Sequence, residues 1–247
     1  MIPLKSESDL AALRESGMIL AGILRQMEKE IRPGISTKEI DLIAEELVRR
    51  EKVLPAFKGY RGYPATICAS VNEEIVHGIP SQRCLVEGDI VSIDLGIKHN
   101  GFFSDAAYTL PVGRISEEKQ KLITVTRQAL EAGIAGAREG NHLYDISAQI
   151  QRVVEQNGLS VVRQFVGHGI GVNLHEEPEI PNFGKPHQGA ALQKGMVLAI
   201  EPMVNCGGWE CEVLDDGWTA VTMDRLPSAH FEHTVAITGR GPEILTA

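Results

Sequence analysis

The chain has 247 residues, of which 43% are hydrophobic and 23% charged, and its formal net charge is −9 at pH 7. This composition is typical of a globular protein, and the acidic balance argues against a broad nucleic-acid-binding surface and against attachment to anionic membranes. No stretch approaches the roughly 20 apolar residues of a membrane span, and the start lacks the apolar run of a signal peptide. The four cysteines form no CxxC motif, so we expect reduced thiols and a cytoplasmic location.

Four helices are predicted, in two pairs separated by strands. Apolar residues recur at helical spacing over residues 8–31, and the capping box of Ser36 and Glu39 starts a second helix. A third helix is predicted over 116–140, from an N-cap serine to a glycine stop, and a fourth over 142–158. Short β-branched or aromatic segments bounded by Gly or Pro are predicted to be strands, at 88–97, 101–110, 195–204 and 230–238.

The chain repeats part of its pattern. Residues 32–41 align with 138–147 at an offset of 106 residues, and residues 87–95 align within the segment 193–202 at an offset of 107. Coincidence between two generic helix–strand patterns is the alternative, but two nearly equal offsets in the same order favour a duplication. We therefore predict an α+β fold in one catalytic domain, residues 1–247, made of two related halves, about 8–110 and 116–240, with a site between them.

The first candidate site is a pair of acids in a predicted hairpin. Asn-Gly at 100–101 favours a two-residue turn, in which position i faces position 201 − i. Asp94 then faces Ala107, and alternation puts Asp105 on the same face as Asp94, with Cα atoms roughly 7–8 Å apart. Because the flanking residues are apolar, the carboxylates face a covered surface and repel each other unless a metal ion neutralises them. Two acids facing solvent on an open sheet are the other interpretation.

Two glutamates and a histidine extend this set. Glu201 ends an apolar strand before Pro202, Glu232 lies in HFEHTVAI, and His168 stands between glycines in GHGIG. Each glutamate alone fits an ordinary strand-end acid. Together, four carboxylates and one imidazole exceed the ligands that one ion usually takes, and they indicate two ions about 3.5–4 Å apart, of Mn, Fe, Co or Zn.

Two further histidines are candidates for contacts with a substrate. His175 lies seven residues after His168, with two glycines between them, so the two do not form a helical pair of ligands. HEEPE also lacks the second histidine of HExxH, and Pro178 breaks a helix there. An imidazole beside the metals is placed to donate to a substrate oxygen, and His77 in VNEEIVHGIP has the same potential. The alternative for any isolated histidine, these two included, is a surface or capped residue, and this is what we expect for His99, His142 and His187.

These motifs resemble those of the type I methionine aminopeptidases. The resemblance rests on GYRGYPATICASVNEEIVHGIP, GDIVSIDLGIKHNGFFSDAAYTLPVG, VGHGIGVNLHEEP, MVLAIEPMV and DGWTAVTMDRLPSAHFEHTVAIT, in that order, and it covers about residues 4–246. It implies the pita-bread α+β fold and hydrolysis of the initiator methionine from nascent polypeptides whose second residue is small. The early first helix is typical of the bacterial type. We expect a monomer that meets N-terminal methionyl peptides, nascent chains and, transiently, the ribosome.

The resemblance also implies roles for the metal-binding residues. Asp94 and Asp105 bind metal, with Asp105 bridging the two ions, and His168 binds one ion only. Glu201 is a ligand and a general acid/base toward the bridging water, and Glu232 bridges. The cofactor is then a pair of divalent ions, Co, Mn, Fe or Zn.

The substrate-binding residues follow from the same resemblance. His77 contacts the scissile amide nitrogen, and His175 stabilises the oxygen of the tetrahedral intermediate. The methionine side chain is expected in a pocket of Phe57, Tyr60, Tyr63, Cys68 and Trp218, where apolar and sulfur–aromatic contacts suit a thioether.

Two positions depart from the family pattern, and two other functions compete. Ala106 replaces a hydroxyl residue that supports the second aspartate in many members, and Leu174 stands where some have an aromatic residue.

An Xaa-Pro aminopeptidase or dipeptidase shares the fold and metal set but usually carries a large extra N-terminal domain. A non-catalytic binding protein of the same fold is the alternative of another class, and such relatives lose metal ligands.

Overall fold

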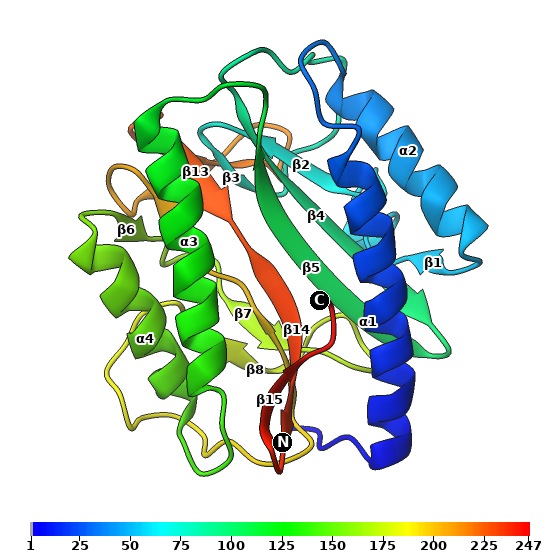
Figure 1. Ribbon diagram of the computed structural model, residues 1–247, viewed down its shortest axis with the longest axis vertical. Helices are drawn as coiled ribbons and strands as arrows, with labels where there is room; N and C mark the ends of the chain where they lie inside the picture. Colours follow the sequence, from blue (N-terminus) through cyan, green and yellow to red (C-terminus); the bar gives the residue numbers. More distant parts are fainter. Residues whose placement is uncertain (1) are drawn as a thin grey trace.

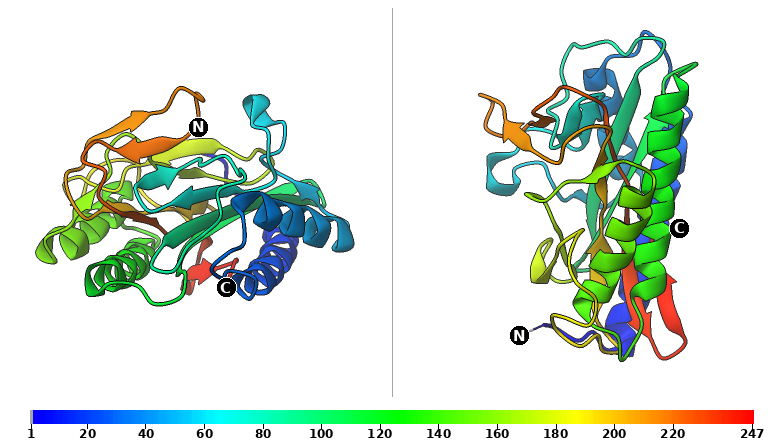
Figure 2. Two further views of the ribbon diagram at one scale, coloured as in Figure 1. Left: turned by 90° about the horizontal axis from the view of Figure 1, so that it is seen from above. Right: turned by 90° about the vertical axis from the view of Figure 1, so that its left-hand side faces the viewer.

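The computed structural model describes residues 2–247, which form four α-helices on one face of a nine-stranded sheet (Figures 1 and 2). The helices are α1 (Glu7–Glu28), α2 (Thr37–Arg50), α3 (Glu117–Gly136) and α4 (Leu143–Gln156). On this face the pair α1 and α2 lies over one half of the sheet and the pair α3 and α4 over the other half. The strands β4, β5 and β14 run between the two pairs in Figure 1. No helix within 2–247 is long and apolar enough to cross a membrane.

The helix predictions are confirmed, with corrections at three ends. The capping box at Ser36 starts α2, and Ser116 caps α3. The first helix is capped by Ser6, so it begins slightly earlier than predicted and ends at Glu28. The third helix ends at Gly136, four residues before the predicted stop at Gly140. There Asn141 Nδ2 donates to the carbonyl of Gly136, and the chain turns back into α4.

Fifteen strands and one short 3₁₀ helix are present in residues 2–247. They are β1 (Leu54–Pro55), η1 (Tyr60–Gly62), β2 (Cys68–Val71), β3 (Glu74–Val76), β4 (Ile90–His99), β5 (Phe102–Pro111), β6 (Ser160–Val161), β7 (Gly167–Gly169), β8 (Glu176–Ile180), β9 (Val197–Ile200), β10 (Met203–Asn205), β11 (Cys211–Val213), β12 (Ala220–Thr222), β13 (Ser228–His230), β14 (Glu232–Thr238) and β15 (Gly241–Ile244). The large sheet has the order β1-β4-β5-β14-β9-β7-β8, with β2 on β4 and β15 on β14. The small sheets have the orders β13-β10-β6 and β11-β12-β3.

The predicted hairpin is confirmed residue by residue. Asp94 pairs with Ala107 and Asp105 with Gly96 across the antiparallel strands β4 and β5. The turn residues Asn100 and Gly101 have φ of 48° and 87°, the left-handed conformation that a two-residue hairpin turn requires at both positions.

Two predicted strands are each divided between two sheets, which is a correction. The segment 195–204 breaks at Pro202, which lacks the N–H needed to continue a ladder, and becomes β9 in the large sheet and β10 in a small one. The segment 230–238 divides in the same way, because β13 ends at His230 and β14 begins at Glu232. The paired strands β10 and β13 therefore leave the large sheet together. Glu201 and Glu232 lie at the point where β10 and β13 separate from the large sheet.

The apolar core lies mainly between the sheet and the helices. One cluster joins α1 and α2 to the inner positions of β4, including Ile93 and Leu95. A second joins α3 and α4 to β9 and β14, including Leu198 and Val235. Because Ile93 and Leu95 point toward the helices, the side chain of Asp94 points to the opposite face of the sheet. The predicted duplication into two halves remains a prediction.

Candidate active site

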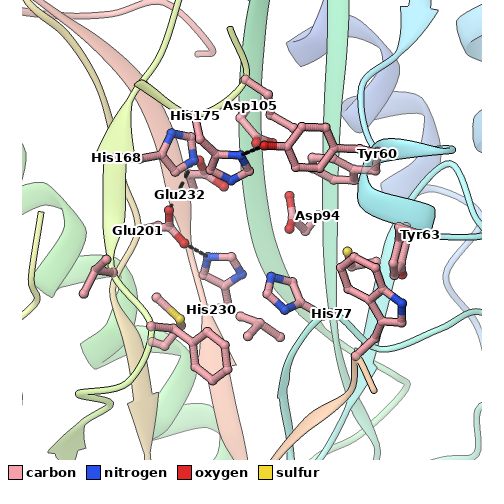
Figure 3. Close-up of a pocket in the computed structure, with 18 of the residues that line it drawn as sticks. Tyr60, Tyr63, His77, Asp94, Asp105, His168, His175, Glu201, His230 and Glu232 are labelled. Atoms are coloured by element: carbon pink, nitrogen blue, oxygen red, sulfur yellow. Dashed lines mark hydrogen bonds and ion pairs between the residues drawn. The ribbon is translucent and has the colours of Figure 1, made fainter. Parts of the chain in front are cut away.

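A cavity of about 280 Å³ opens on the face of the large sheet to which Asp94 points, opposite the helices, and residues of the small sheets, such as Val76 and Met203, also line it. All the metal-binding and substrate-binding residues predicted from the sequence line it, and Figure 3 labels most of them. They come from β2, β4, β5, β7, β14, η1 and the segments that follow β1, η1, β3, β7, β9 and β11.

Strand register explains why the carboxylates converge. Cys68, Asp94, Ala107 and Glu232 form one row across β2, β4, β5 and β14, because each pairs with the next. Asp105 lies two residues from Ala107 on the same face of β5, between the acids of the neighbouring strands. The side chain of Ala106 is turned the other way and packs in the cluster under α1 and α2.

The four carboxylates and His168 meet at the centre of this face. One possible metal-ligand atom each of Asp105, His168 and Glu232, a carboxylate oxygen or an imidazole nitrogen, lies within 4.8 Å of the other two. Glu201, directly after β9, brings Oε1 to 3.6 Å from Nε2 of His168 (Figure 3). Within the described residues, three carboxylate oxygens of this group are buried without a hydrogen-bond partner: Asp94 Oδ1, Asp105 Oδ1 and Glu232 Oε1.

The histidine of this group is oriented as a ligand. His168 Nδ1 lies 2.9 Å from the carbonyl oxygen of Gly169. Since a carbonyl oxygen only accepts, Nδ1 carries the proton, and the lone pair of Nε2 points toward the carboxylates. A partner on the backbone thus sets both the tautomer and the direction of the free nitrogen.

Burial makes this group unfavourable without a cation. It raises the pKa of Asp105 to about 7 and, together with repulsion among the acids, lifts the pKa values of Asp94, Glu201 and Glu232 well above their ordinary range. Burial also lowers the pKa of His168 to about 4, which keeps its imidazole neutral. Divalent metal ions reverse the penalty on the carboxylates, and the unpaired oxygens are suitable ligands, so the residues present fit a metal centre.

His175 lies against His168 and Tyr60. Its Nδ1 is 2.9 Å from the hydroxyl of Tyr60, and its ring centroid is 4.3 Å from that of His168. Although His175 is partly exposed, desolvation by the cavity wall, together with the positive charge of Arg61, lowers its pKa to about 4. Its ring is therefore neutral at physiological pH and offers Nε2 to the cavity.

His77 is held in a strained conformation at the opposite wall. Its φ of 61° is left-handed, which a non-glycine residue adopts at a cost of order 1 kcal/mol or more, typically where function requires it. The ring lies edge-on to Phe165 and Trp218, with centroids 5.5 and 6.3 Å away. Burial lowers the pKa of His77, so this imidazole is neutral as well.

The residues expected around a methionine side chain form one apolar wall. Tyr63 stacks edge-to-face on Trp218 at 5.0 Å and donates from its hydroxyl to the carbonyls of Ile67 and Gly78, each at 3.0 Å. Phe57, Cys68 and Tyr60 pack in the same cluster, which also contains Leu174.

His230 also lines this cavity, and it was not predicted from the sequence. This residue is 2% exposed, and its Nε2 lies 3.6 Å from Oε2 of Glu201 (Figure 3). Among residues 2–247 that nitrogen is one of the few buried polar atoms without a hydrogen-bond partner. Alternation along HFE places residue 230 on the same side as Glu232, so a signal for it was present in the sequence.

Comparisons with known proteins show the family of the chain. The model of metallopeptidase family M24 matches residues 11–239. The chain is 54% identical over 246 residues to a methionine aminopeptidase of Clostridium perfringens and 51% identical to methionine aminopeptidase 1 of Bacillus subtilis, covering 100% of this chain and 99% of the relative in both cases.

Solved structures give the same result for the fold. A methionine aminopeptidase of Thermotoga maritima superposes with a TM-score of 0.98 at 47% identity, over 100% of this chain and 99% of that one. A prolidase of Pyrococcus furiosus has a TM-score of 0.81 at 22% identity and is covered over 65% of its length, which is a likeness of fold alone. The predicted pita-bread α+β fold and family are thus confirmed, and this chain belongs to the methionine aminopeptidases of metallopeptidase family M24.

Proposed function

We propose that this protein removes the initiator methionine from nascent polypeptides whose second residue is small. The single observation that carries the proposal is the convergence of four carboxylates, three of them buried and that of Glu201 13% exposed, with one oriented imidazole in a cavity with an apolar aromatic wall. Full-length relatives that are more than half identical and are named methionine aminopeptidases support the same activity.

The metal ligands in this proposal are Asp94, Asp105, His168, Glu201 and Glu232. These five side chains would hold two divalent ions, Co, Mn, Fe or Zn. When bound, the ions supply Lewis acidity and lower the pKa of a water molecule.

The chain supplies proton transfer and hydrogen bonding. Glu201 takes the proton of the attacking water and passes it to the leaving nitrogen, and its buried position favours holding that proton. His175 donates from Nε2 to the carbonyl oxygen of the scissile bond when the hydroxyl of Tyr60 donates to Nδ1. His77 contacts the scissile amide nitrogen from the opposite wall.

The apolar wall selects the substrate side chain. Phe57, Tyr60, Tyr63, Cys68 and Trp218 offer aromatic faces and a thiol to a flexible thioether. We further propose a cytoplasmic monomer that meets its substrates as chains leave the ribosome.

Metal add-back with three tripeptides tests the proposal. The protein is stripped of metal, and Mn, Co, Fe or Zn is returned singly before cleavage of Met-Ala-Ser, Met-Ile-Ser and Ala-Pro-Ala is followed. We expect metal-dependent release of methionine from Met-Ala-Ser alone. Preference for Ala-Pro-Ala would indicate an Xaa-Pro aminopeptidase or dipeptidase, and binding of metal without any cleavage would indicate a non-catalytic protein.

A further inference from the structure

A second group of metal-binding side chains lies outside the active-site cavity. His142 directly precedes α4, Asp145 lies in its first turn, and His187 belongs to the connection between β8 and β9. Both histidines were predicted from the sequence to be surface or capped residues. In the structure one donor atom from each of the three side chains lies within 4.8 Å of the other two.

The carboxylate of this group is held in place by the backbone. Asp145 Oδ2 accepts from the N–H of His142 at 2.7 Å, and Oδ1 accepts from the N–H of His187 at 2.8 Å. The Asp145 side chain is only 12% exposed, so it has little freedom to turn away. Each oxygen of a carboxylate has two lone pairs, which leaves both oxygens able to bind a cation as well.

Each imidazole lies near one carboxylate oxygen of Asp145, at or slightly beyond the separation expected of two ligands that share one ion. His187 Nδ1 is 3.4 Å from Asp145 Oδ1, and His142 Nδ1 is 4.0 Å from Asp145 Oδ2. Nitrogen and oxygen ligands about 2.0–2.2 Å from one zinc ion, at two corners of a tetrahedron, are about 3.4 Å apart. The first pair has this spacing already, and the second reaches it by a small side-chain rotation.

The two backbone segments that carry the histidines are fixed against each other. The N–H of Leu143 donates to the carbonyl of Ala190 at 2.9 Å, and the N–H of Tyr144 donates to the carbonyl of Gln188 at 3.1 Å. The ring of Tyr144 also packs directly on Gly184 and Gly189. Metal binding therefore has to order only exposed side chains, because the backbone positions are set by the fold.

We propose that His142, Asp145 and His187 form a peripheral site for a divalent transition ion such as zinc, separate from the active site. Two imidazoles and one carboxylate are typical ligands of zinc, cobalt, nickel and copper, whereas calcium and magnesium prefer oxygen ligands alone. The exposure of His187, whose side chain is 83% accessible, leaves room for water to complete the coordination. The bound ion joins the β8–β9 connection to the start of α4.

Zinc titration of matched full-length variants tests the site. His142→Asn and His187→Asn are combined in one variant, because asparagine keeps the backbone N–H groups that bind Asp145 and tolerates the left-handed φ of 63° at position 187. We expect equilibrium dialysis with zinc to find one ion fewer per chain than in the unmodified protein. The matched control is His99→Asn, which alters a partly buried histidine that has one acidic neighbour, Glu15, at 3.3 Å, and it should keep the full count.

A second background separates this site from the proposed catalytic centre. Asp105→Asn with His168→Ala removes two proposed catalytic ligands but leaves the peripheral group intact. This variant should still bind one zinc ion, and adding the two asparagine substitutions should abolish that binding. Equal zinc counts with and without the asparagine substitutions, in both backgrounds, would overturn the proposal whatever the activity of the enzyme.

Discussion

Replacing Asp105 with asparagine should stabilise the metal-free protein while weakening the stabilisation that metal bound in the active-site cavity provides. Asp105 is 4% exposed, and burial raises its pKa to about 7. Relative to the ordinary value of 3.8, this corresponds to about 4 kcal/mol of unfavourable free energy for the ionised side chain in the folded state, at about 1.4 kcal/mol per pKa unit. Asparagine has nearly the same shape without the charge, although its amide must also be desolvated.

The expected gain in unfolding free energy is therefore a fraction of that figure, about 1–3 kcal/mol at pH 7.5. For a chain of this length it corresponds to a rise in Tm of roughly 2–12 °C. The pKa is raised in the folded state, so the penalty on the unmodified protein is full above pH 7 and is lost as the pH falls toward 3.8. The difference in Tm between variant and parent should accordingly shrink by more than half between pH 7.5 and 5.

Thermal unfolding of chelator-treated protein, followed by circular dichroism at both pH values, measures this effect. Asp215→Asn is the matched control, because it removes the same charge from an exposed position outside the cavity and should change Tm little. With metal at about 100 times its dissociation constant, the parent should gain about 2.7 kcal/mol and the variant much less. A lower Tm for metal-free Asp105→Asn at pH 7.5, or an equal gain at pH 5, would refute the reasoning.

Three further predictions concern the walls of the cavity. His175→Ala should lower kcat about 10²–10³-fold with unchanged metal content, since it removes a hydrogen-bond donor to the reacting oxygen. In the metal-free parent, NMR titration should give His175 a pKa near 4 rather than 6.5. Gly96→Ala should lower Tm by roughly 2–12 °C, because its Cβ would lie 2.8 Å from the ring of Phe57 and overpacking costs about 1–3 kcal/mol; an unchanged Tm would contradict the packing. Trp218→Ala should raise KM for methionyl peptides roughly tenfold, because it removes part of the apolar wall and the edge-to-face pair with Tyr63. A change confined to kcat would contradict a role of Trp218 in binding the methionine side chain.

Local patterns were enough to predict the elements and part of the site. The Asn-Gly turn sets the register of its hairpin, so the neighbouring positions of Asp94 and Asp105 follow from the sequence. Side-chain alternation and capping residues likewise predict strand faces and helix starts, because both depend on contacts within a few residues.

The same patterns failed where a segment responds to distant contacts. Glycine at position 140 predicted the end of α3, but the helix ends at Gly136, where Asn141 holds the last carbonyl and the chain returns to α4. The strand at 195–204 was predicted as continuous, since Pro202 is compatible with an edge or a break and only pairing with β13 decides which.

The sequence by itself determined the helices, the hairpin and the types of residue available for chemistry, because each of these depends on spacing over a few neighbouring positions. Only the tertiary structure decided which of those residues meet. The pairing of β14 with β5 and β9 brings Glu232 to Asp105, and the shared exit of β10 and β13 from the large sheet brings His230 to Glu201. Docking of the β8–β9 connection on α4 brings His187 to Asp145, and no local period encodes a contact across 42 residues.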